Sequence, residues 1–204
     1  MGRDEPDFTI ELSAMRKGAQ RICGIDEAGR GPWAGPVVAA AVILDRNAIP
    51  PGLNDSKKLS HAQREALFYP IVRTARIGIG IADVDRIDRD NVLGATMWAM
   101  GQALAQLGDV SLALIDGNRA PKLSCNVQTV IGGDAKSLSI SAASIIAKVT
   151  RDRIMMAHDA TYPQYGFARH KGYGTQVHQQ ALTAHGPCPL HRKSFAPVAA
   201  FFMR

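Results

Sequence analysis

Short apolar segments that end at a turn residue or an acid alternate with longer amphipathic segments along this chain. Short apolar runs bounded by Gly, Pro or Asp are typical of buried β-strands. Five segments have this form, at residues 21–26, 37–44, 76–82, 112–115 and 127–131. A Gly- and Pro-rich turn joins the first two, which predicts a hairpin. In the third, Ile alternates with Gly, which indicates a strand with close backbone neighbours.

Helices are predicted between and after these strands. Ser60 and Gln63 have the spacing of a capping box, so we expect a helix from there to about Pro70. Further helices are expected at residues 91–107, 135–158 and 175–184. The order β-β-α-β-α-β-β-α predicts an α/β fold, with a mixed β-sheet flanked by helices.

Length and composition fit one domain with short additions. The chain has 204 residues, of which 46% are hydrophobic and 21% charged, an ordinary globular composition. We expect a polar, partly disordered lead-in over residues 1–20, a principal domain over 21–160 and a C-terminal loop and helix extension over 161–204. Three scattered Cys, no secretory signal and no apolar run near the roughly 20 residues of a membrane span predict a cytoplasmic protein without membrane association.

The charge is unevenly distributed. The formal net charge is +6, but residues 1–116 carry 13 basic and 15 acidic side chains, whereas residues 117–204 carry 11 and 3. An acidic part joined to a basic part suits a protein that holds cations on one side and a polyanion on the other.

Four carboxylates follow the predicted strands. Asp26 and Glu27 end the first, Asp116 ends the fourth, and Asp134 comes shortly after the fifth. Sites in open α/β sheets gather at the carboxyl ends of strands, and carboxylates this close together stay ionised only around a cation. Each acid also has a plain structural alternative: Asp134 as a helix cap, Asp116 in a turn with Gly117, and the first pair as a solvated strand end.

Hard divalent cations with oxygen ligands, Mg²⁺ or Mn²⁺, suit such a set of acids. Two such ions would serve cleavage of a phosphodiester bond, with one activating water and the other stabilising the leaving oxygen.

Six blocks of the chain, in order, resemble the signature of the type 2 ribonucleases H, the ribonuclease HII family. They are GIDEAGRGPWAGPVVAAAV at 24–42, LNDSKKLS at 53–60, LIDGN at 114–118, GDAKSLSISAASIIAKVTRDR at 133–153, YGFARHKGYGT at 165–175 and GPCPLHRKSF at 186–195. The resemblance implies a ribonuclease H-like fold with a small C-terminal helical extension. Residues 21–160 would be the catalytic domain, and 161–204 would complete the substrate groove.

The resemblance also implies an activity. It is metal-dependent endonucleolytic cleavage of the RNA in RNA–DNA hybrids, including nicking on the 5′ side of single ribonucleotides in duplex DNA to leave 3′-hydroxyl and 5′-phosphate ends. By motif, Asp26, Glu27, Asp116 and Asp134 would be the catalytic metal ligands for two ions, Mn²⁺ or Mg²⁺. We expect a monomer. A non-catalytic nucleic-acid-binding protein and a different metal-dependent phosphoesterase remain as alternatives.

Other residues acquire expected roles from the same blocks. Gly29, Arg30 and Gly31 match the element that reads the ribose 2′-hydroxyl, and Tyr173 matches the tyrosine that stacks on the following deoxyribose. The 2′-hydroxyl is the group that distinguishes RNA from DNA. Further candidates for contact with the nucleic-acid backbone are Lys57, Lys58, Arg169, Lys171 and Arg192, each of which could instead be an ordinary surface charge.

Two further patterns are weaker. His185, Cys188 and His191 have metal-like spacing but lack the fourth ligand of a structural zinc site. Residues 198–202 resemble a peptide that binds a sliding clamp, although Phe195 stands where Gln is expected.

Overall fold

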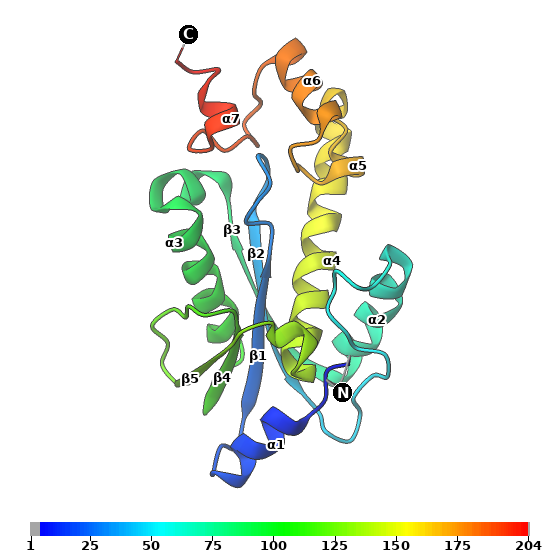
Figure 1. Ribbon diagram of the computed structural model, residues 1–204, viewed down its shortest axis with the longest axis vertical. Coiled ribbons are helices and arrows are strands. Elements are labelled where there is room, and N and C mark those ends of the chain that lie inside the picture. The colour runs from blue at the N-terminus through cyan, green and yellow to red at the C-terminus, as the bar shows by residue number, and fades with distance from the viewer. Residues whose placement is uncertain (1–4, 204) are drawn as a thin grey trace.

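A five-stranded mixed sheet forms the centre of the molecule (Figure 1). The computed structural model describes residues 5–203, and its strands are β1 (Ile22–Ala28), β2 (Val37–Leu44), β3 (Ala75–Ala82), β4 (Leu112–Asp116) and β5 (Asn126–Val130). Their order across the sheet is β3-β2-β1-β4-β5. β1 pairs antiparallel with β2 and parallel with β4, so the predicted hairpin and mixed sheet are confirmed.

Helices cover both faces of this sheet (Figure 1). They are α1 (Thr9–Arg16), α2 (His61–Thr74), α3 (Val84–Ala105), α4 (Leu138–Thr161), α5 (Phe167–His170), α6 (Gln176–His185) and α7 (Ala196–Ala199), with 3-10 turns η1 (Gly133–Ala135) and η2 (Pro163–Tyr165). α3 packs on one face, and α4 packs on the other with α2 beside it. α5, α6 and α7 gather at one end of the sheet, and α1 lies at the opposite end.

The core has two layers because β2 is buried on both faces. Val37, Ala39 and Ala41 pack toward α3, whereas Ala40 and Val42 pack toward α4. Successive side chains of a strand point to opposite faces, so a continuous apolar run is what a doubly covered strand requires. No helix within residues 5–203 is long and apolar enough to cross a membrane.

The alternating glycines of β3 allow α3 to approach closely, as predicted. A Cβ at Gly78 would lie 2.0 Å from the carbonyl oxygen of Ala103, and one at Gly80 would lie 1.9 Å from that of Ala99. Any side chain at these two positions would therefore push α3 away from the sheet.

Three elements differ from the sequence-based expectation. α1 forms where a partly disordered lead-in was expected, and its buried Glu11 accepts hydrogen bonds from the Ser137 hydroxyl (2.6 Å) and the Ser139 amide (2.9 Å) at the start of α4. This carboxylate complements the positive end of the α4 dipole. α3 begins at Val84 and continues across a kink at Asn91 (φ 58°), where the helix was expected to start. α2 continues past Pro70 to Thr74.

Candidate active site

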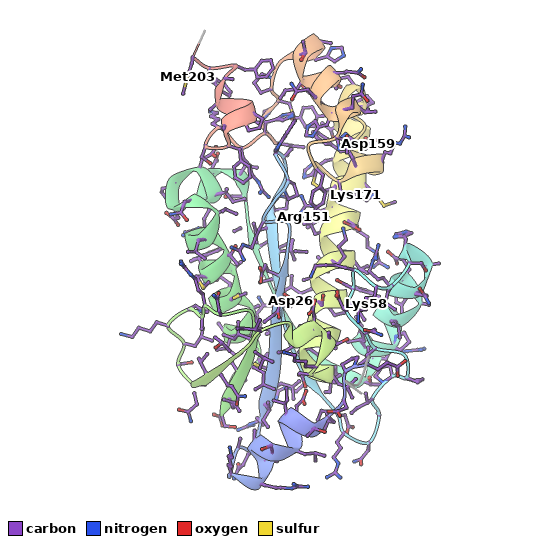
Figure 2. The ribbon with its side chains drawn as sticks, viewed as in Figure 1. Asp26, Lys58, Arg151, Asp159, Lys171 and Met203 are labelled. Atoms are coloured by element: carbon purple, nitrogen blue, oxygen red, sulfur yellow. The ribbon has the colours of Figure 1, made fainter. Side chains whose placement is uncertain are left out.

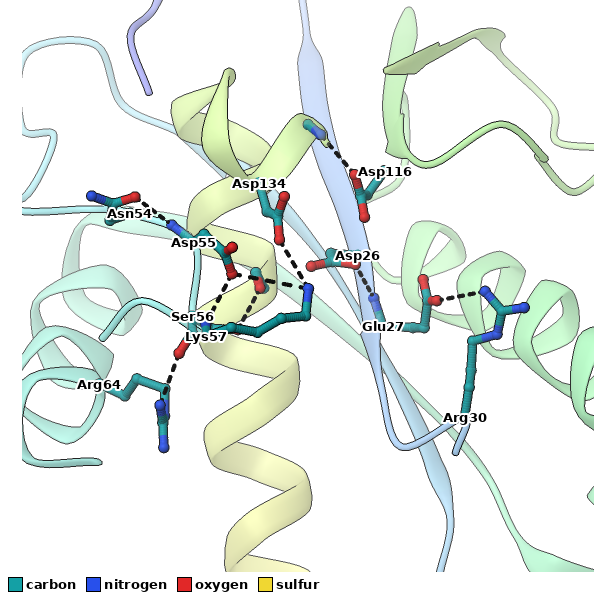
Figure 3. Close-up of polar contacts among 12 residues, drawn as sticks. Asp26, Glu27, Arg30, Asn54, Asp55, Ser56, Lys57, Arg64, Asp116 and Asp134 are labelled. Atoms are coloured by element: carbon teal, nitrogen blue, oxygen red, sulfur yellow. Dashed lines mark hydrogen bonds and ion pairs between the residues drawn. The ribbon is translucent and has the colours of Figure 1, made fainter. Parts of the chain in front are cut away.

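Three of the four predicted acids converge at one edge of the sheet. β1 and β4 are parallel neighbours, so Asp26 and Asp116 lie at the same edge, and η1 brings Asp134 beside them. Carboxylate oxygens from these three residues lie within 4.8 Å of one another. Figure 3 shows the three side chains pointing toward a common space. We call these residues the acid cluster.

Asp134 is not the cap of the long helix. The hydroxyl of Ser137 accepts from the Ile140 amide at 3.2 Å and caps α4, while Asp134 lies in the preceding turn η1. The Gly133 amide donates to Oδ1 of Asp116 at 2.7 Å, which fastens that turn to the end of β4. The capping alternative for Asp134 is therefore excluded, and its carboxylate is available to the cluster.

Burial and mutual repulsion disfavour the charges of these acids. Burial raises the pKa of Asp26 well above its usual range, and the negative charges of Glu27 and Asp116 raise it further. Burial also raises the pKa of Asp134, against the opposing effect of Lys57. Such a set of oxygen donors is stabilised as carboxylates by a cation, and it fits the hard divalent ions Mg²⁺ and Mn²⁺.

Lys57 supplies a positive charge to this space from the loop between β2 and α2. Its Nζ lies 3.2 Å from Oδ2 of Asp134, although the side chain is 79% exposed. Burial opposes the Lys57 charge, but the carboxylates of Asp134 and Asp55 outweigh it and raise the pKa of Lys57. The loop is fixed at its base, where the hydroxyls of Ser56 and Ser144 lie 2.7 Å apart. Ser144 partly offsets the rise in the pKa of Asp26.

Glu27 points to the other face of the sheet. Consecutive residues of a strand alternate, so Asp26 faces α4 whereas Glu27 faces α3. Its Oε1 accepts from Nη1 of Arg30 at 3.2 Å. Burial raises the pKa of Glu27, and Arg30 opposes this rise. A cavity of about 380 Å³ on the α3 side of the sheet is lined by Glu27, Asp116 and residues of α3. The same two acids also line the smaller cavity described next, so they are reached from both sides of this sheet edge.

One cavity of about 240 Å³ joins residues from several of the sequence blocks. Its lining consists of Asp26, Glu27, Ala28, Gly29, Arg30, Gly31, Ser56, Lys57, Asp116, Ser144, Lys148 and Tyr173. Lys148 was not predicted, although it lies four residues after Ser144 and therefore on the same face of α4. Its Nζ is 2.7 Å from Oδ1 of Asp152.

Arg192 has no exposed surface, which differs from its expected contact with substrate. Its guanidinium donates to the carbonyl oxygens of Gly29 (2.6 Å), Arg30 (3.0 Å) and Gly35 (2.8 and 2.9 Å). Arg151, also buried, donates to the carbonyls on either side of Gly35. The five donors of an arginine suit it to gather several carbonyls. Arg151 and Arg192 therefore fix the conformation of the 29–36 loop from its buried side.

Gly29 is where that loop requires a glycine. Its φ is +99°, and a Cβ there would lie 2.1 Å from Nε of Arg151. The bulk of Arg151 thus determines how closely the loop lies over α4. Figure 2 shows Arg151, on α4, nearer than Asp26 to the end of the molecule that carries α5 and α6.

Tyr173 is half exposed beside this loop. A Cβ at Gly31 would lie 3.9 Å from its ring, and the Arg151 guanidinium lies 5.8 Å from the ring centroid. Lys58 and Arg169 are exposed and do not line the cavity. Nζ of Lys171 donates to the Ala168 carbonyl.

The His185, Cys188 and His191 pattern does not form a metal site. Among residues 5–203, the acid cluster is the only group of three or more side chains placed to hold an ion. Nδ1 of His191 instead accepts from the Cys188 amide at 2.9 Å.

The sequence and the fold were compared with those of known proteins. The family model described as Ribonuclease HII matches residues 23–198. Relatives named ribonuclease HII from Rhizorhabdus wittichii and Parvibaculum lavamentivorans are each 56% identical, over 96% and 95% of this chain and 96% and 72% of their own. The crystal structure of ribonuclease H2 from Pyrococcus horikoshii superposes with a TM-score of 0.73 at 25% identity, covering 91% of this chain and 98% of that one.

A ribonuclease H-like sheet with carboxylates gathered at its edge defines a metal-dependent nuclease. The chain belongs to the ribonuclease HII family. It is accordingly an endonuclease that depends on divalent metal and hydrolyses RNA in RNA–DNA hybrids.

Proposed function

We propose that this enzyme also nicks duplex DNA on the 5′ side of a single embedded ribonucleotide, leaving 3′-hydroxyl and 5′-phosphate ends. The observation that carries this proposal is a single cavity lined by three of the acids, residues 29–31 and Tyr173; the three acids are Asp26, Glu27 and Asp116. Because these parts are adjacent, the bond cleaved would lie next to the groups that recognise a ribose and the sugar that follows it.

The acids divide between two positions in this proposal. Asp26, Asp116 and Asp134 would hold one ion, and Glu27 with Asp116 would hold a second once substrate oxygens complete its ligands. When bound, Mn²⁺ or Mg²⁺ would supply water activation and stabilisation of the leaving oxygen. Lys57 would then be displaced from Asp134 and become free to contact a phosphate, as its exposed side chain permits.

The 29–31 segment would recognise the 2′-hydroxyl through its backbone. The guanidinium of Arg192 donates to the carbonyls of both Gly29 and Arg30, so these carbonyls on the inner side of the loop already have hydrogen-bond partners. The outer side lines the cavity, where a glycine backbone lets a ribose approach closely. Tyr173, next to Gly31, would stack on the deoxyribose that follows.

We also propose that residues 161–204 complete the substrate groove. Tyr173 comes from this segment and lines the cavity, and Arg192 positions the loop opposite. Lys58, Arg169 and Lys171 would contact phosphates farther along the duplex. Binding through phosphates weakens with salt in proportion to the phosphates neutralised, so duplex affinity would fall steeply as salt rises.

We also propose that the enzyme is a monomer and that its C-terminal residues contact a sliding clamp. Phe202 and Met203 are 53% and 84% exposed near the C-terminal end of the described chain, whereas Phe195 packs against the core and Arg192. Deletion of residues 201–204 should abolish clamp binding. Unchanged binding would remove this segment from consideration.

The proposed function is tested with duplex DNA that carries one ribonucleotide, incubated with Mn²⁺ or Mg²⁺. We expect a single nick 5′ of the ribonucleotide, a downstream fragment with a 5′-phosphate, and no cleavage of the matched all-deoxy duplex. Asp134→Asn should abolish the nick while sparing duplex affinity, because it removes a metal ligand and leaves the phosphate contacts.

The alternatives give different outcomes in the same assay. Duplex binding without a nick above a metal-free control would favour a non-catalytic binding protein. Cleavage of the all-deoxy duplex would favour a different phosphoesterase.

A further inference from the structure

Three buried histidines in the C-terminal part of the molecule belong to no part of the acid cluster. His170, His178 and His191 are 8%, 0% and 1% exposed. The rings of His170 and His178 stack with centroids 4.5 Å apart and planes at 16°, and the rings of His178 and His191 lie 5.2 Å apart. We call these residues the histidine cluster. Buried imidazoles without an acidic partner need another source of hydrogen bonds.

Hydrogen-bond donors and acceptors can be assigned along the His191 and His178 pair. Nδ1 of His178 lies 2.9 Å from the carbonyl oxygen of Tyr173, which can only accept, so Nδ1 carries the proton. Nε2 of a neutral His178 is then an acceptor, and Nε2 of His191, 3.0 Å away, donates to it. This leaves Nδ1 of His191 to accept from the Cys188 amide at 2.9 Å. One directional chain thus runs from Cys188 to the Tyr173 carbonyl.

His170 makes a second chain beside the first. Its Nε2 lies 2.7 Å from the carbonyl oxygen of Tyr165 and donates to it. Its Nδ1 accepts from the Gly172 amide at 3.2 Å. Both chains require neutral rings, and burial accordingly lowers the pKa of His170 and lowers the pKa of His178 and of His191 to about 4.

The two chains of hydrogen bonds reach the Gly172 amide and the Tyr173 carbonyl, which lie on either side of the exposed Tyr173 ring. Gly172 and Tyr173 are held by stacked imidazoles, while the Tyr173 side chain is 43% exposed beside the cavity. The turn that presents it contains two successive residues with positive φ, Lys171 at 53° and Gly172 at 84°. Such a turn is unfavourable for a residue with a Cβ and persists where surrounding contacts fix it. The histidine cluster supplies two of those contacts, at the Gly172 amide and the Tyr173 carbonyl, and the Trp33 amide donates to the Gly172 carbonyl at 2.9 Å.

We propose that His170, His178 and His191 are positioning residues that fix Tyr173 and thereby set the preference of the enzyme for a ribonucleotide followed by DNA. This inference rests on the proposed function, because stacking of Tyr173 on the deoxyribose is part of that proposal. The histidines touch neither substrate nor metal. They act through the backbone at positions 172 and 173.

The test compares kcat/KM for two substrates, duplex DNA with a single ribonucleotide and a hybrid with a continuous RNA strand. The ratio of the two values measures the junction preference. His178→Ala should lower this ratio about tenfold or more, because misplacement by about 1 Å can cost up to about 100-fold in rate. His178→Asn should restore most of it, since its amide nitrogen takes the place of Nδ1 and can donate to the Tyr173 carbonyl.

A double-mutant cycle separates positioning from stability. In a Tyr173→Ala background, His178→Ala should change the ratio less than about twofold, because the ring it positions is gone. If His178→Ala lowers both kcat/KM values equally, or keeps its full effect on the ratio without Tyr173, the proposal is overturned. His61→Ala, at the exposed start of α2, is the matched control and should leave the ratio unchanged.

A second pair of variants covers a failure of His178→Ala to fold, as judged by circular dichroism. His191→Ala should lower the ratio, and His191→Gln should restore it, because its amide can still donate toward Nε2 of His178. A wild-type enzyme that does not nick the single-ribonucleotide duplex would overturn the proposed function. A wild-type enzyme that nicks it, with a ratio unchanged in both histidine variants, would overturn this inference alone.

Discussion

The acid cluster and the histidine cluster both place ionisable side chains inside the protein, and they differ in how burial is compensated. In the acid cluster, Asp26, Asp116 and Asp134 crowd like charges together, with the Lys57 ammonium group beside Asp134. In the histidine cluster, every ring nitrogen has a hydrogen-bond partner and no ring carries a charge in the arrangement described above. The first arrangement is incomplete without a ligand, whereas the second is complete as folded.

The difference indicates that the two clusters have separate roles at the two ends of the cavity. A site that must bind ions retains unfavourable repulsion until they arrive, so its energy depends on ligand and pH. A support that must hold a loop in one position gains from saturated hydrogen bonds that a ligand does not alter. Five predictions test this contrast, beginning with the largest expected effect.

Asp26→Asn should affect activity and stability in opposite directions. Cleavage should fall on the order of 10³-fold or more, the scale seen when transition-state charge stabilisation is removed. The metal-free variant should melt higher, by roughly 2–4 °C for each kcal/mol of repulsion relieved. Activity assays and thermal melts in a chelator measure both, with the exposed Asp109→Asn as the control. A lower melting temperature would contradict the picture of a repulsive cluster.

The histidine cluster should make the protein sensitive to acid. Burial lowers the pKa of His178 and of His191 from about 6.5 to about 4 in the folded protein, so the unfolded chain binds protons first as pH falls. Their contribution to stability is complete above pH 6.5 and is lost toward pH 4, by on the order of 3 kcal/mol for each histidine. Denaturant unfolding between pH 7.5 and 4.5 should show this slope, and His191→Gln should flatten it. An equal slope in the variant would assign the acid sensitivity elsewhere.

Asp26 has the opposite dependence on pH. Its pKa is raised in the folded state, so its unfavourable contribution grows as pH rises above the unfolded value and is absent in acid. In the metal-free protein, Asp26→Asn should therefore gain stability over the wild type as pH rises, while keeping the histidine-dependent slope.

Divalent metal should stabilise the protein through the acid cluster alone. Mn²⁺ at 100 times its Kd should add about 2.7 kcal/mol to the free energy of unfolding. At one fixed Mn²⁺ concentration, the gain should be larger at pH 8 than at pH 6, because the ligands must be deprotonated. Thermal melts with and without Mn²⁺ measure it without any substrate. His191→Gln should keep the full gain and Asp26→Asn should lose most of it; equal gains in both would place the ion elsewhere.

Lys57→Met should have the smallest effect. Removal of one phosphate contact should weaken duplex binding a few-fold and reduce the slope of log affinity against log salt by about 1. Filter-binding titrations at several salt concentrations in Ca²⁺ or chelator give both values. Lys122→Met, on the loop between β4 and β5 outside the cavity lining, serves as the matched control. An unchanged salt slope would restrict Lys57 to its ion pair with Asp134.

The sequence predicted the parts of the site that depend on strand ends. Asp26 and Asp116 each follow an apolar run, and parallel pairing of β1 with β4 brings such residues together. The alternation of side chains along β1 also indicates how the first two acids are oriented. Asp26 and Glu27 are consecutive, so they had to face opposite sides of the sheet.

Other features had no sequence signal because their partners are backbone groups distant in the chain. Arg192 resembled a surface charge, yet its acceptors are carbonyls more than 150 residues earlier. α1 is short and polar, and it is fixed by a carboxylate, Glu11, that contacts the start of α4. The kink at Asn91 interrupts the helical pattern of the sequence, so the pattern predicted a start at residue 91 although α3 begins at Val84.

The bonds from Arg192 to Gly29 and Arg30 join residues 163 and 162 positions apart. On a ribosome, at about 5–20 residues per second, roughly 8–30 s separate the synthesis of the loop from that of the side chain that shapes it. By the end of that interval, all five strands and all four acids have been made. A nascent chain can therefore bring the acid cluster together well before Arg192 fixes the 29–31 segment, and the last part of the cavity to be fixed is one of the first to be translated.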